Sequence, residues 1–312
     1  MHRNQPGAEL TELSAVHVTR LDNENCAYGA AILDRSCVTR DHVIGRCFVP
    51  KGKLAGSWNL ILNACAQCNR KKSDLEDDLS AISMQPDGLG GHARPDKALA
   101  SEARRKARRS ESRLTGRKVA ASTERLTVNT ALRPGPRLTF NLWAPPQAAS
   151  ARVFQLARMH AMAFFYWLTY DRAAKRGRFW RGQFVPILEA LRSDWGNIVH
   201  TGFMQAVVSW EPRLLCTAAA DGFFKVAIRK HPVATCWSWA FEWNHNVRVV
   251  GFFGDRDAAS ELIGKLSPLD TETVIRSENE RLDVRLEVPL KDEQDLLFVW
   301  EGSGPVQSPK LL

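Results

Sequence analysis

The sequence predicts an α+β protein of 312 residues in three parts, and three observations support this division. Cysteine, glycine and asparagine are concentrated in residues 21–85, which indicates a compact N-terminal domain over residues 1–85. Residues 86–150 are rich in proline, glycine and basic side chains, as expected for a connector. From residue 151 the chain becomes more apolar, and helix-like and strand-like periods alternate. We therefore expect residues 151–312 to form a separate C-terminal α+β domain.

The composition is that of a globular protein. Apolar residues make up 44% of the chain and charged residues 25%, which argues against a fully disordered protein. No stretch approaches the roughly 18 apolar residues that a membrane span needs, and the N-terminus lacks an apolar segment of the signal-peptide type. Seven cysteines without an export signal indicate reduced thiols, some of them on a metal. We expect a cytoplasmic protein without membrane contact.

The residues best suited to chemistry lie in the N-terminal block. Asp41 and His42 are adjacent, so on an extended backbone their side chains point to opposite sides. Such a pair can divide its tasks, with a carboxylate on a hard cation and an imidazole that takes a proton from water. The amide oxygen of Asn69 beside Asp41 would complete a cation site with room for phosphate oxygens, as Mg²⁺ prefers. Three basic residues follow Asn69 and would bind the phosphates of a nucleic-acid backbone: Arg70, Lys71 and Lys72.

A helix start is also expected within this block. Ser73 and Glu76 have the spacing of a capping box, in which each side chain satisfies a backbone amide of the first turn. The acidic residues around them are expected to be solvated and to be favoured by the helix dipole.

The connector carries a local excess of positive charge. Residues 94–137 hold 13 basic and 4 acidic side chains, whereas residues 151–312 hold 20 and 19. The stretch from Ser101 to Val119 predicts a basic helix with few apolar residues to bury. A basic segment beside a nearly neutral remainder is typical of an arm that binds nucleic acid, and a solvated linker is the alternative. The basic side chains expected to bind are Arg104, Arg105, Arg108 and Arg109.

Hydrophobic periods predict the elements of the C-terminal domain. Three helices are expected over residues 153–175, 183–193 and 258–266, the last one capped by Asp255 or Asp257. Strands are expected over residues 223–229, 236–243 and 247–253, with shorter ones near 273–275, 282–288 and 296–300. A turn at residues 244–246 joins the second and third strands. Four aromatic residues share one face of the second strand, and they are Trp237, Trp239, Phe241 and Trp243. We expect them to pack in the core of the domain, and the alternative is that they stack on nucleic-acid bases.

The N-terminal residues resemble the HNH, or ββα-metal, nuclease family. In that family a strand ends in Asp-His, the returning strand carries Asn-Leu, and Cys-x-x-Cys-Asn-x-x-Lys opens a helix. The matching residues are Asp41-His42, Asn59-Leu60 and the run from Cys65 to Lys72, within about residues 22–80. The resemblance implies a metal-dependent endonuclease that cuts DNA, of the kind found in restriction, phage defence or mobile elements.

The resemblance also implies a role for each matching residue. His42 would be the general base that deprotonates the attacking water, and Asn59 would fix the loop that orients His42. Asp41 and Asn69 would hold one Mg²⁺ or Mn²⁺ ion against the scissile phosphate. Lys72 would help to neutralise phosphate charge.

Relatives with two Cys-x-x-Cys pairs hold a structural Zn²⁺ ion, and the site implied here is incomplete. Three thiols match this pattern, those of Cys26, Cys65 and Cys68, whereas Gly29 stands where the fourth thiol is expected. Cys37 is the first candidate for the fourth zinc ligand and Cys47 is the second, and the ligand can also be absent.

Two other functions stay open. The chain could be a non-catalytic zinc-knuckle protein that binds nucleic acid, although the intact Asp41, His42 and Asn69 favour catalysis. It could also be a toxin that acts on DNA and needs an immunity partner. DNA is the expected partner of the endonuclease and of the toxin, and a nucleic acid is the expected partner of the zinc-knuckle protein. The C-terminal domain is expected to add recognition or regulation, through a homodimer or a regulatory partner.

Overall fold

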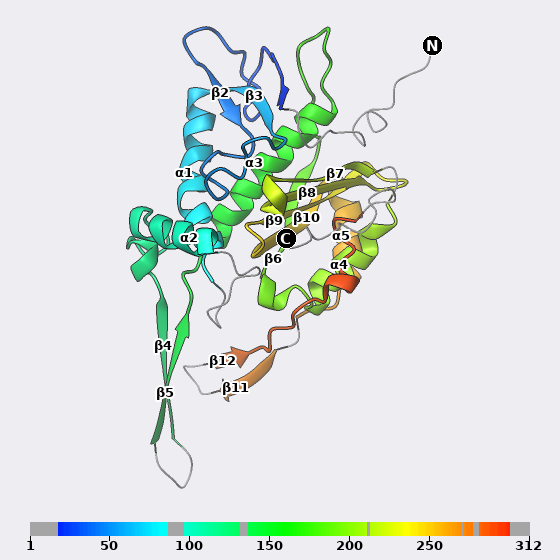
Figure 1. The fold of residues 1–312 in the computed structure, drawn as a ribbon. Helices are drawn as coiled ribbons and strands as arrows, with labels where there is room; N and C mark the ends of the chain where they lie inside the picture. The colour runs from blue at the N-terminus through cyan, green and yellow to red at the C-terminus, as the bar shows by residue number, and fades with distance from the viewer. Residues whose placement is uncertain are drawn as a thin grey trace, which may run out of the picture.

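The structure is a computed structural model that describes residues 18–86, 97–131, 137–210, 213–269, 271–276 and 281–299. It contains a small sheet, a larger sheet and two hairpins among its helices, so the predicted α+β class is confirmed. Figure 1 shows the small sheet and its helix packed beside the larger sheet, with one long hairpin extending away from both. No helix of the described residues is long and apolar enough to cross a bilayer.

The described N-terminal residues form a three-stranded sheet followed by a helix. The strands are β1 (Thr19–Arg20), β2 (Val38–His42) and β3 (Leu60–Cys65), and α1 (Ala66–Ser83) follows directly. The central strand β3 runs antiparallel to β2 and parallel to β1. Its Leu60 and Leu62 side chains are completely buried, which anchors the sheet in the core and places α1 next to β2.

Helix α1 begins earlier than the capping box at Ser73 and Glu76 predicted. Cys65 is the N-cap, and its thiol accepts a hydrogen bond from the backbone amide of Cys68. The helix therefore starts where the β3 ladder ends, and Ser73 lies well inside it. The capping box expected for Ser73 and Glu76 is wrong, because the backbone amides at these positions already belong to helical turns.

The basic segment is folded against the N-terminal layer. The predicted basic helix is α2 (Lys97–Arg109), which ends well before Val119. Leu99 and Ala103 join the main hydrophobic cluster, and Ala107 packs with Val119 against the end of α1. The turn η1 (Val119–Ala121) then leads into the protruding hairpin of β4 (Glu124–Ala131) and β5 (Arg137–Ala144). Residues 97–121 are thus packed, and the sequence did not indicate this.

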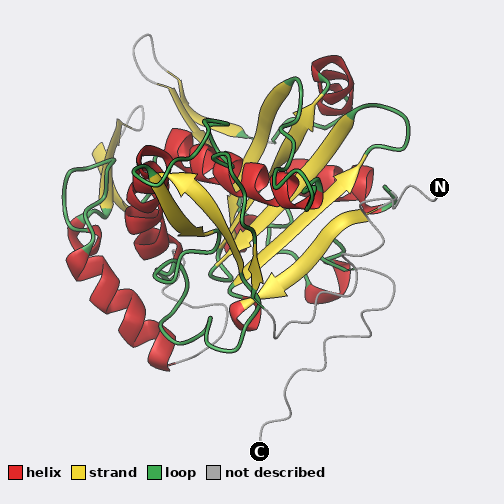
Figure 2. Ribbon diagram, turned by 90° about the horizontal axis from the view of Figure 1, so that it is seen from above, coloured by secondary structure: helices red, strands yellow, loops and turns green. Residues whose placement is uncertain are grey.

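The rest of the described chain forms a five-stranded antiparallel sheet with helices on both faces. Its strands are β6 (Gln183–Leu191), β7 (Arg213–Ala219), β8 (Phe224–Lys230), β9 (Cys236–Trp243) and β10 (Val247–Gly254), in the order β6-β10-β9-β8-β7. Figures 1 and 2 show α3 (Ser150–Leu168) on one face, with α4 (Ile198–Val208) and α5 (Arg256–Gly264) on the other. The smaller elements are β11 (Glu272–Arg276), β12 (Arg281–Val284), η2 (Arg192–Asp194), η3 (Ala220–Gly222) and η4 (Asp292–Gln294).

Most of the predicted C-terminal elements are confirmed. Strands β8, β9 and β10 lie where the two-residue period placed them. Asn244 and His245 in the turn between β9 and β10 have φ values of 53° and 57°, as tight hairpin turns require. Asp255 caps α5 by accepting hydrogen bonds from two backbone amides. The strand expected near residues 296–300 is not found over residues 296–299.

The helix predicted for residues 183–193 is wrong, because residues 183–191 form the edge strand β6. This strand pairs with β10 along its whole length. Pro186 lies beside an irregularity in that pairing, opposite Gly251. Proline inside a helix would cost about 3 kcal/mol, whereas an edge strand accepts it at a bulge. Pro186 was therefore the signal in the sequence against a helix.

One hydrophobic cluster joins the N-terminal layer, α3 and the large sheet. Trp58, just before β3, stacks on Phe164 of α3 with ring centroids 6.0 Å apart. Phe48 meets Trp243 of β9 edge to face, with centroids 5.5 Å apart. The aromatic face of β9 is buried in this cluster, as predicted. The predicted N-terminal and C-terminal domains therefore share a core.

Candidate functional site

The polar residues singled out in the sequence lie where β2 meets α1. Asp41 and His42 are the last two residues of β2. Asp41 is only 5% exposed, whereas His42 is half-buried. This difference is expected for neighbours on a strand, whose side chains point to opposite faces. Asp41 thus points into the protein, and His42 lies nearer to solvent.

The Asp41 carboxylate is bonded at both oxygens. The Tyr28 hydroxyl donates to Oδ2, and the ammonium group of Lys72 lies 3.3 Å from Oδ1. Burial raises the pKa of the Asp41 carboxyl, and the Lys72 charge and the Tyr28 hydrogen bond offset this only in part. Asp41 is therefore a desolvated carboxylate that gains from any cation placed beside it.

Lys72 and Glu76 complete a buried ionic group, and we call Tyr28, Asp41, Lys72 and Glu76 the β2–α1 cluster. Lys72 is fully buried, and its ammonium also donates to Glu76 Oε1 at 2.6 Å and to the His42 carbonyl at 2.9 Å. Burial alone would lower the Lys72 pKa, but the two carboxylates outweigh it and raise the pKa. The ion pairs give this cluster two carboxylates and one ammonium group.

Glu76 is a functional candidate that the sequence analysis missed. Besides Lys72, it accepts a hydrogen bond from the Gly45 amide at 3.2 Å, in the loop that follows His42. Its Oε1 also lies 3.9 Å from Nε2 of His160 on α3. Glu76 was expected to be solvated at a helix start. Its spacing of four residues from Lys72, on a helix that begins at Ala66, was the available signal.

His42 and Asn59 have the surroundings of a base and a loop anchor. Burial and the nearby Arg46 charge lower the pKa of His42, so its imidazole is neutral near pH 7 and can accept a proton. The Asn59 side chain accepts from the Ile44 amide at 3.2 Å and donates to the Ile44 carbonyl at 2.9 Å. Asn59 thus fixes the backbone two residues after His42.

Asn69 lies on the side of α1 that faces β2. Its Nδ2 donates to Thr39 Oγ1 at 3.1 Å. Thr39 is two residues from Asp41 and shares its face of the strand, while Lys72 is one turn along α1 from Asn69. Asn69 and Asp41 therefore both lie where β2 packs against α1. No hydrogen bond among the described residues joins them directly.

The carboxylate of Asp41 and the carboxamide of Asn69 are suitable oxygen ligands for Mg²⁺ or Mn²⁺. The Lys72 ammonium holds a place beside Asp41 Oδ1 that a metal ion would need. Since Glu76 also binds Lys72, the lysine has a second acceptor when it leaves Asp41. The two residue types suit a divalent cation, and an ion bound at Asp41 Oδ1 would require Lys72 to move.

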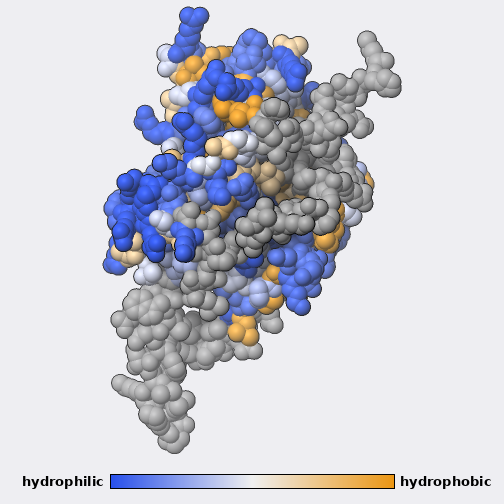
Figure 3. Space-filling view, viewed as in Figure 1, coloured by the Kyte–Doolittle hydropathy of each residue, from blue (hydrophilic) through white to orange (hydrophobic). Residues whose placement is uncertain are grey.

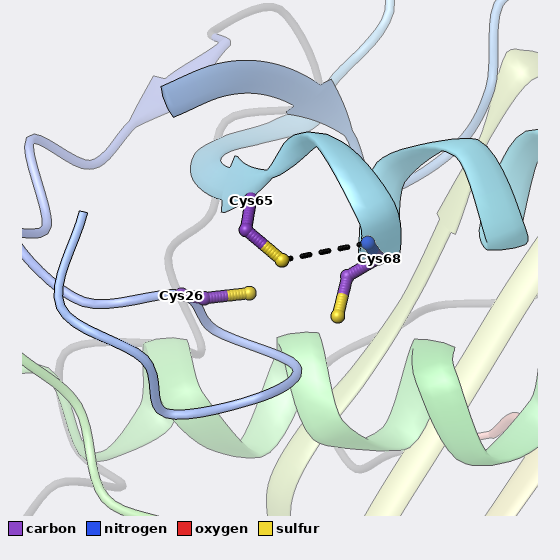
Figure 4. Close-up of side chains that lie close together, drawn as sticks. All are labelled: Cys26, Cys65 and Cys68. Carbon is purple, nitrogen blue, oxygen red and sulfur yellow. Dashed lines mark hydrogen bonds between the residues drawn. The ribbon is translucent and has the colours of Figure 1, made fainter. Parts of the chain in front are cut away.

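Three of the predicted zinc ligands come together, and the fourth does not. The sulfur atoms of Cys26, Cys65 and Cys68 lie within 4.8 Å of one another, and Figure 4 shows the three side chains grouped together. The Cys37 thiol instead contacts the backbone of Asp34, at 3.4 Å from its amide. Cys47 is exposed, and its carbonyl accepts from Lys106. The expectation that Cys37 supplies the fourth ligand is therefore not met, because its side chain turns toward its own loop.

The basic residues divide into a surface set and a buried pair. The exposed ones are Arg70, Lys71, Arg104, Arg105, Arg108 and Arg109, and Figure 3 shows a hydrophilic surface over α1 and α2. Lys72 is buried, so its assignment to the DNA-binding surface is wrong. Lys106 also points inward and donates to Ser80 at 2.7 Å, and burial lowers its pKa to about 8.

Comparisons of the chain with protein-family models, with curated proteins and with solved structures found no match. The family resemblance therefore depends on residues 22–80 alone. Its carriers are Asp41, His42, Asn59 and the run from Cys65 to Lys72.

Proposed function

We propose that this protein is a metal-dependent endonuclease that hydrolyses DNA phosphodiester bonds. The observation that carries the proposal is that candidate residues from three separate stretches of chain lie around β2 and the loop that follows it. Asp41 and His42 end β2, and Asn59 binds the loop that follows them. Asn69 lies on α1 against the same strand. These residue types are the ones that hold a hard cation and move a proton.

His42 is proposed as the general base. It is half-buried, and its lowered pKa keeps the imidazole ready to take a proton from water at neutral pH. Asn59 holds the adjoining loop and thereby limits the movement of the strand end that carries His42. A divalent cation on Asp41 and Asn69 would stabilise the negative charge that develops on the phosphate.

The charge balance of the β2–α1 cluster supports a cation there. Asp41 and Glu76 share one ammonium group, so the cluster has one carboxylate more than it has cations. His160 adds no positive charge near pH 7, because burial lowers its pKa to about 4. In the proposed exchange Lys72 leaves Asp41 and stays with Glu76. This frees Asp41 Oδ1 without leaving an unpaired buried ammonium.

The exposed cations of α1 and α2 are proposed to bind the DNA backbone without regard to sequence. Arg104, Arg105, Arg108 and Arg109 lie on a helix that is packed onto α1 through Lys106. This packing holds the charges in a fixed place beside the C-terminal half of α1, which suits phosphate binding. The large sheet is proposed to limit cutting, through a second copy of the chain or a regulatory partner.

A plasmid-nicking assay with Mg²⁺ or Mn²⁺ tests the proposal. Wild-type protein should nick supercoiled DNA, and His42→Ala should slow nicking by at least about 100-fold, since a general base typically contributes that much. Asn69→Ala should lose cleavage and keep DNA binding. Gln67→Ala is the matched control, because Gln67 is exposed in the same turn of α1.

One result would overturn the catalytic proposal. If wild type and His42→Ala leave the plasmid equally intact across metals and pH, the chain does not cut DNA. An Asn69→Ala variant that nicks at the wild-type rate would remove Asn69 from the cation site and leave the role of His42 standing.

The rival function is a non-catalytic nucleic-acid-binding protein. The observation in its favour is that Tyr28 and Lys72 bond both oxygens of Asp41. If that arrangement is permanent, Lys72 acts as a fixed counter-ion and Asp41 serves only the core. DNA binding through α2 that is insensitive to Mg²⁺ and accompanied by no cleavage would support this rival.

A further inference from the structure

Three thiols form a compact group at the start of α1. In a four-ligand site the fourth position would fall at Gly29, which has no side chain. Cys26 comes from the loop before β2, Cys65 is the N-cap of α1, and Cys68 lies in the first turn of α1 (Figure 4). Their sulfur atoms lie within 4.8 Å of one another. Sulfur ligands of a tetrahedral zinc ion are about 3.8 Å apart, given Zn–S bonds of about 2.3 Å. Small side-chain movements would therefore bring the three sulfurs onto one ion.

Two loops of this group have the same local geometry. The Gly29 amide donates to Cys26 Sγ at 3.4 Å, and the Cys68 amide donates to Cys65 Sγ at 3.5 Å. In each loop the first sulfur accepts a hydrogen bond from the amide three residues later. Gly29 therefore occupies in one loop the position that Cys68 occupies in the other.

Neither packing nor backbone geometry requires glycine at position 29. A β-carbon on Gly29 would lie 3.4 Å from Cys68 Sγ and 3.9 Å from Cys26 Sγ, which are ordinary contact distances. Gly29 is also outside the positive-φ region in which glycine is favoured. Because Gly29 is exposed, the corner that a fourth side chain would fill is accessible to water.

We propose that Cys26, Cys65 and Cys68 bind one Zn²⁺ ion whose fourth ligand comes from solvent beside Gly29. Closed four-thiolate sites are structural, whereas three protein ligands leave zinc a position for water or another small donor. The site therefore holds the loop before β2 to α1 and also binds an exchangeable small ligand. The proposal is independent of DNA cleavage, because its test measures metal coordination.

The test compares full-length wild type, Gly29→Cys and Gly29→Ser, reduced with a phosphine and loaded with Co²⁺ in place of zinc. Wild type as purified should contain one zinc per chain. Charge-transfer absorption per bound Co²⁺ should be about one third higher in Gly29→Cys, which offers four thiolates instead of three. Gly29→Ser, the control of similar size, should keep the wild-type intensity. Imidazole should shift the Co²⁺ bands of wild type and leave those of Gly29→Cys unchanged.

Two results would overturn the proposal. Folded wild type that binds neither zinc nor Co²⁺ would show that the thiols are not a metal site. A wild-type Co²⁺ spectrum that equals that of Gly29→Cys and ignores imidazole would show a fourth ligand from the protein. If Gly29→Cys does not fold, the imidazole titration of wild type tests whether the fourth ligand is exchangeable. Cys68→Ser then tests the thiolate count, because it should lose about one third of the charge-transfer intensity.

Discussion

Two buried ionic clusters of this protein differ in their balance of charge. The β2–α1 cluster has two carboxylates for the single ammonium of Lys72. The second group, which we call the sheet cluster, consists of Lys225, Glu242, Arg248 and Asp295. It has two carboxylates and two cations. The β2–α1 cluster is therefore the one that can accept a further cation.

The two clusters also differ in how firmly their cations are held. Lys225, Glu242 and Arg248 are at paired positions on β8, β9 and β10, so the strand ladder fixes their spacing. The Arg248 guanidinium donates to Glu242 at 2.8 Å and lies 3.6 Å over the Trp195 ring. Lys72 reaches its acceptors on a single flexible stem. The comparison favours a structural role for the Arg248 guanidinium, and the proposed exchange concerns Lys72 alone.

The largest expected effect is on the sheet cluster. Arg248→Met should lower the free energy of unfolding by about 3–5 kcal/mol, because it leaves the buried Glu242 carboxylate and the partly buried Asp295 carboxylate without their main partner. Chemical denaturation measures the change, and Arg256→Met at an exposed position of α5 is the control. A decrease in unfolding free energy below about 1 kcal/mol would show that the sheet cluster does not have the structural role inferred for it.

A pH titration compares the histidines that lie beside the two clusters. Burial lowers the pKa of His160, next to Glu76, and of His200, near Arg248, to about 4 in each case. Between about pH 6.5 and 4 the unfolded histidines are protonated and the folded ones are not, so stability falls as the pH falls. Each histidine should contribute about 3 kcal/mol to this loss.

Single variants measure how much each histidine contributes to the dependence of unfolding free energy on pH. His160→Asn and His200→Asn should each flatten the dependence of unfolding free energy on pH by a similar amount, and the double variant should flatten it by both amounts. The slope is the readout, since either substitution also changes packing. A slope that is unchanged in His160→Asn would mean that His160 is protonated in the folded protein at these pH values.

A smaller effect is expected on metal affinity. Lys72→Met removes the ammonium that competes for Asp41, so Mn²⁺ should bind about tenfold more tightly, equivalent to about 1.4 kcal/mol. Electron paramagnetic resonance of free Mn²⁺ measures the affinity, and Lys71→Met at the exposed neighbour is the control. Equal Mn²⁺ affinity in wild type and Lys72→Met would place the ion away from Asp41.

The smallest effects concern surface charge outside both clusters. Neutralising Arg104, Arg105, Arg108 or Arg109 one at a time should weaken DNA binding on every sequence. Each change should reduce the salt slope of the binding constant by about 0.9. Lys230→Gln at an exposed position of β8 is the control. Variants with unchanged slopes would show that α2 does not contact phosphates.

The sequence predicted features that depend on local pattern. The alternating aromatic residues of β9, the turn at Asn244 and the cap at Asp255 each follow from a short stretch of residues, and the structure has them. Strand β6 was mistaken for a helix, because its partly buried residues fit the 3.6-residue period of a helix as well as the two-residue period of a strand. Pairing with β10 makes this segment a strand, and that pairing is not visible in the local sequence.

The site was predictable in its residue types and less so in its contacts. Asn59 binds the backbone of Ile44 in the loop after His42, and its role in orienting His42 stays a prediction. The burial of Glu76 depends on Gly45 and on His160, which is distant in the sequence. The direction of the Cys37 thiol depends on its own tight loop. Neither contact has a signature in the sequence pattern.

The shared core has a consequence for synthesis on the ribosome. Phe48 and Trp58 pack against α3 and against Trp243, which emerge much later than the residues of β2 and α1. A nascent chain would therefore expose these rings until the large sheet is made. The core around the N-terminal layer would be completed only after β9 has been made, so chains that stop before β9 would leave these rings exposed.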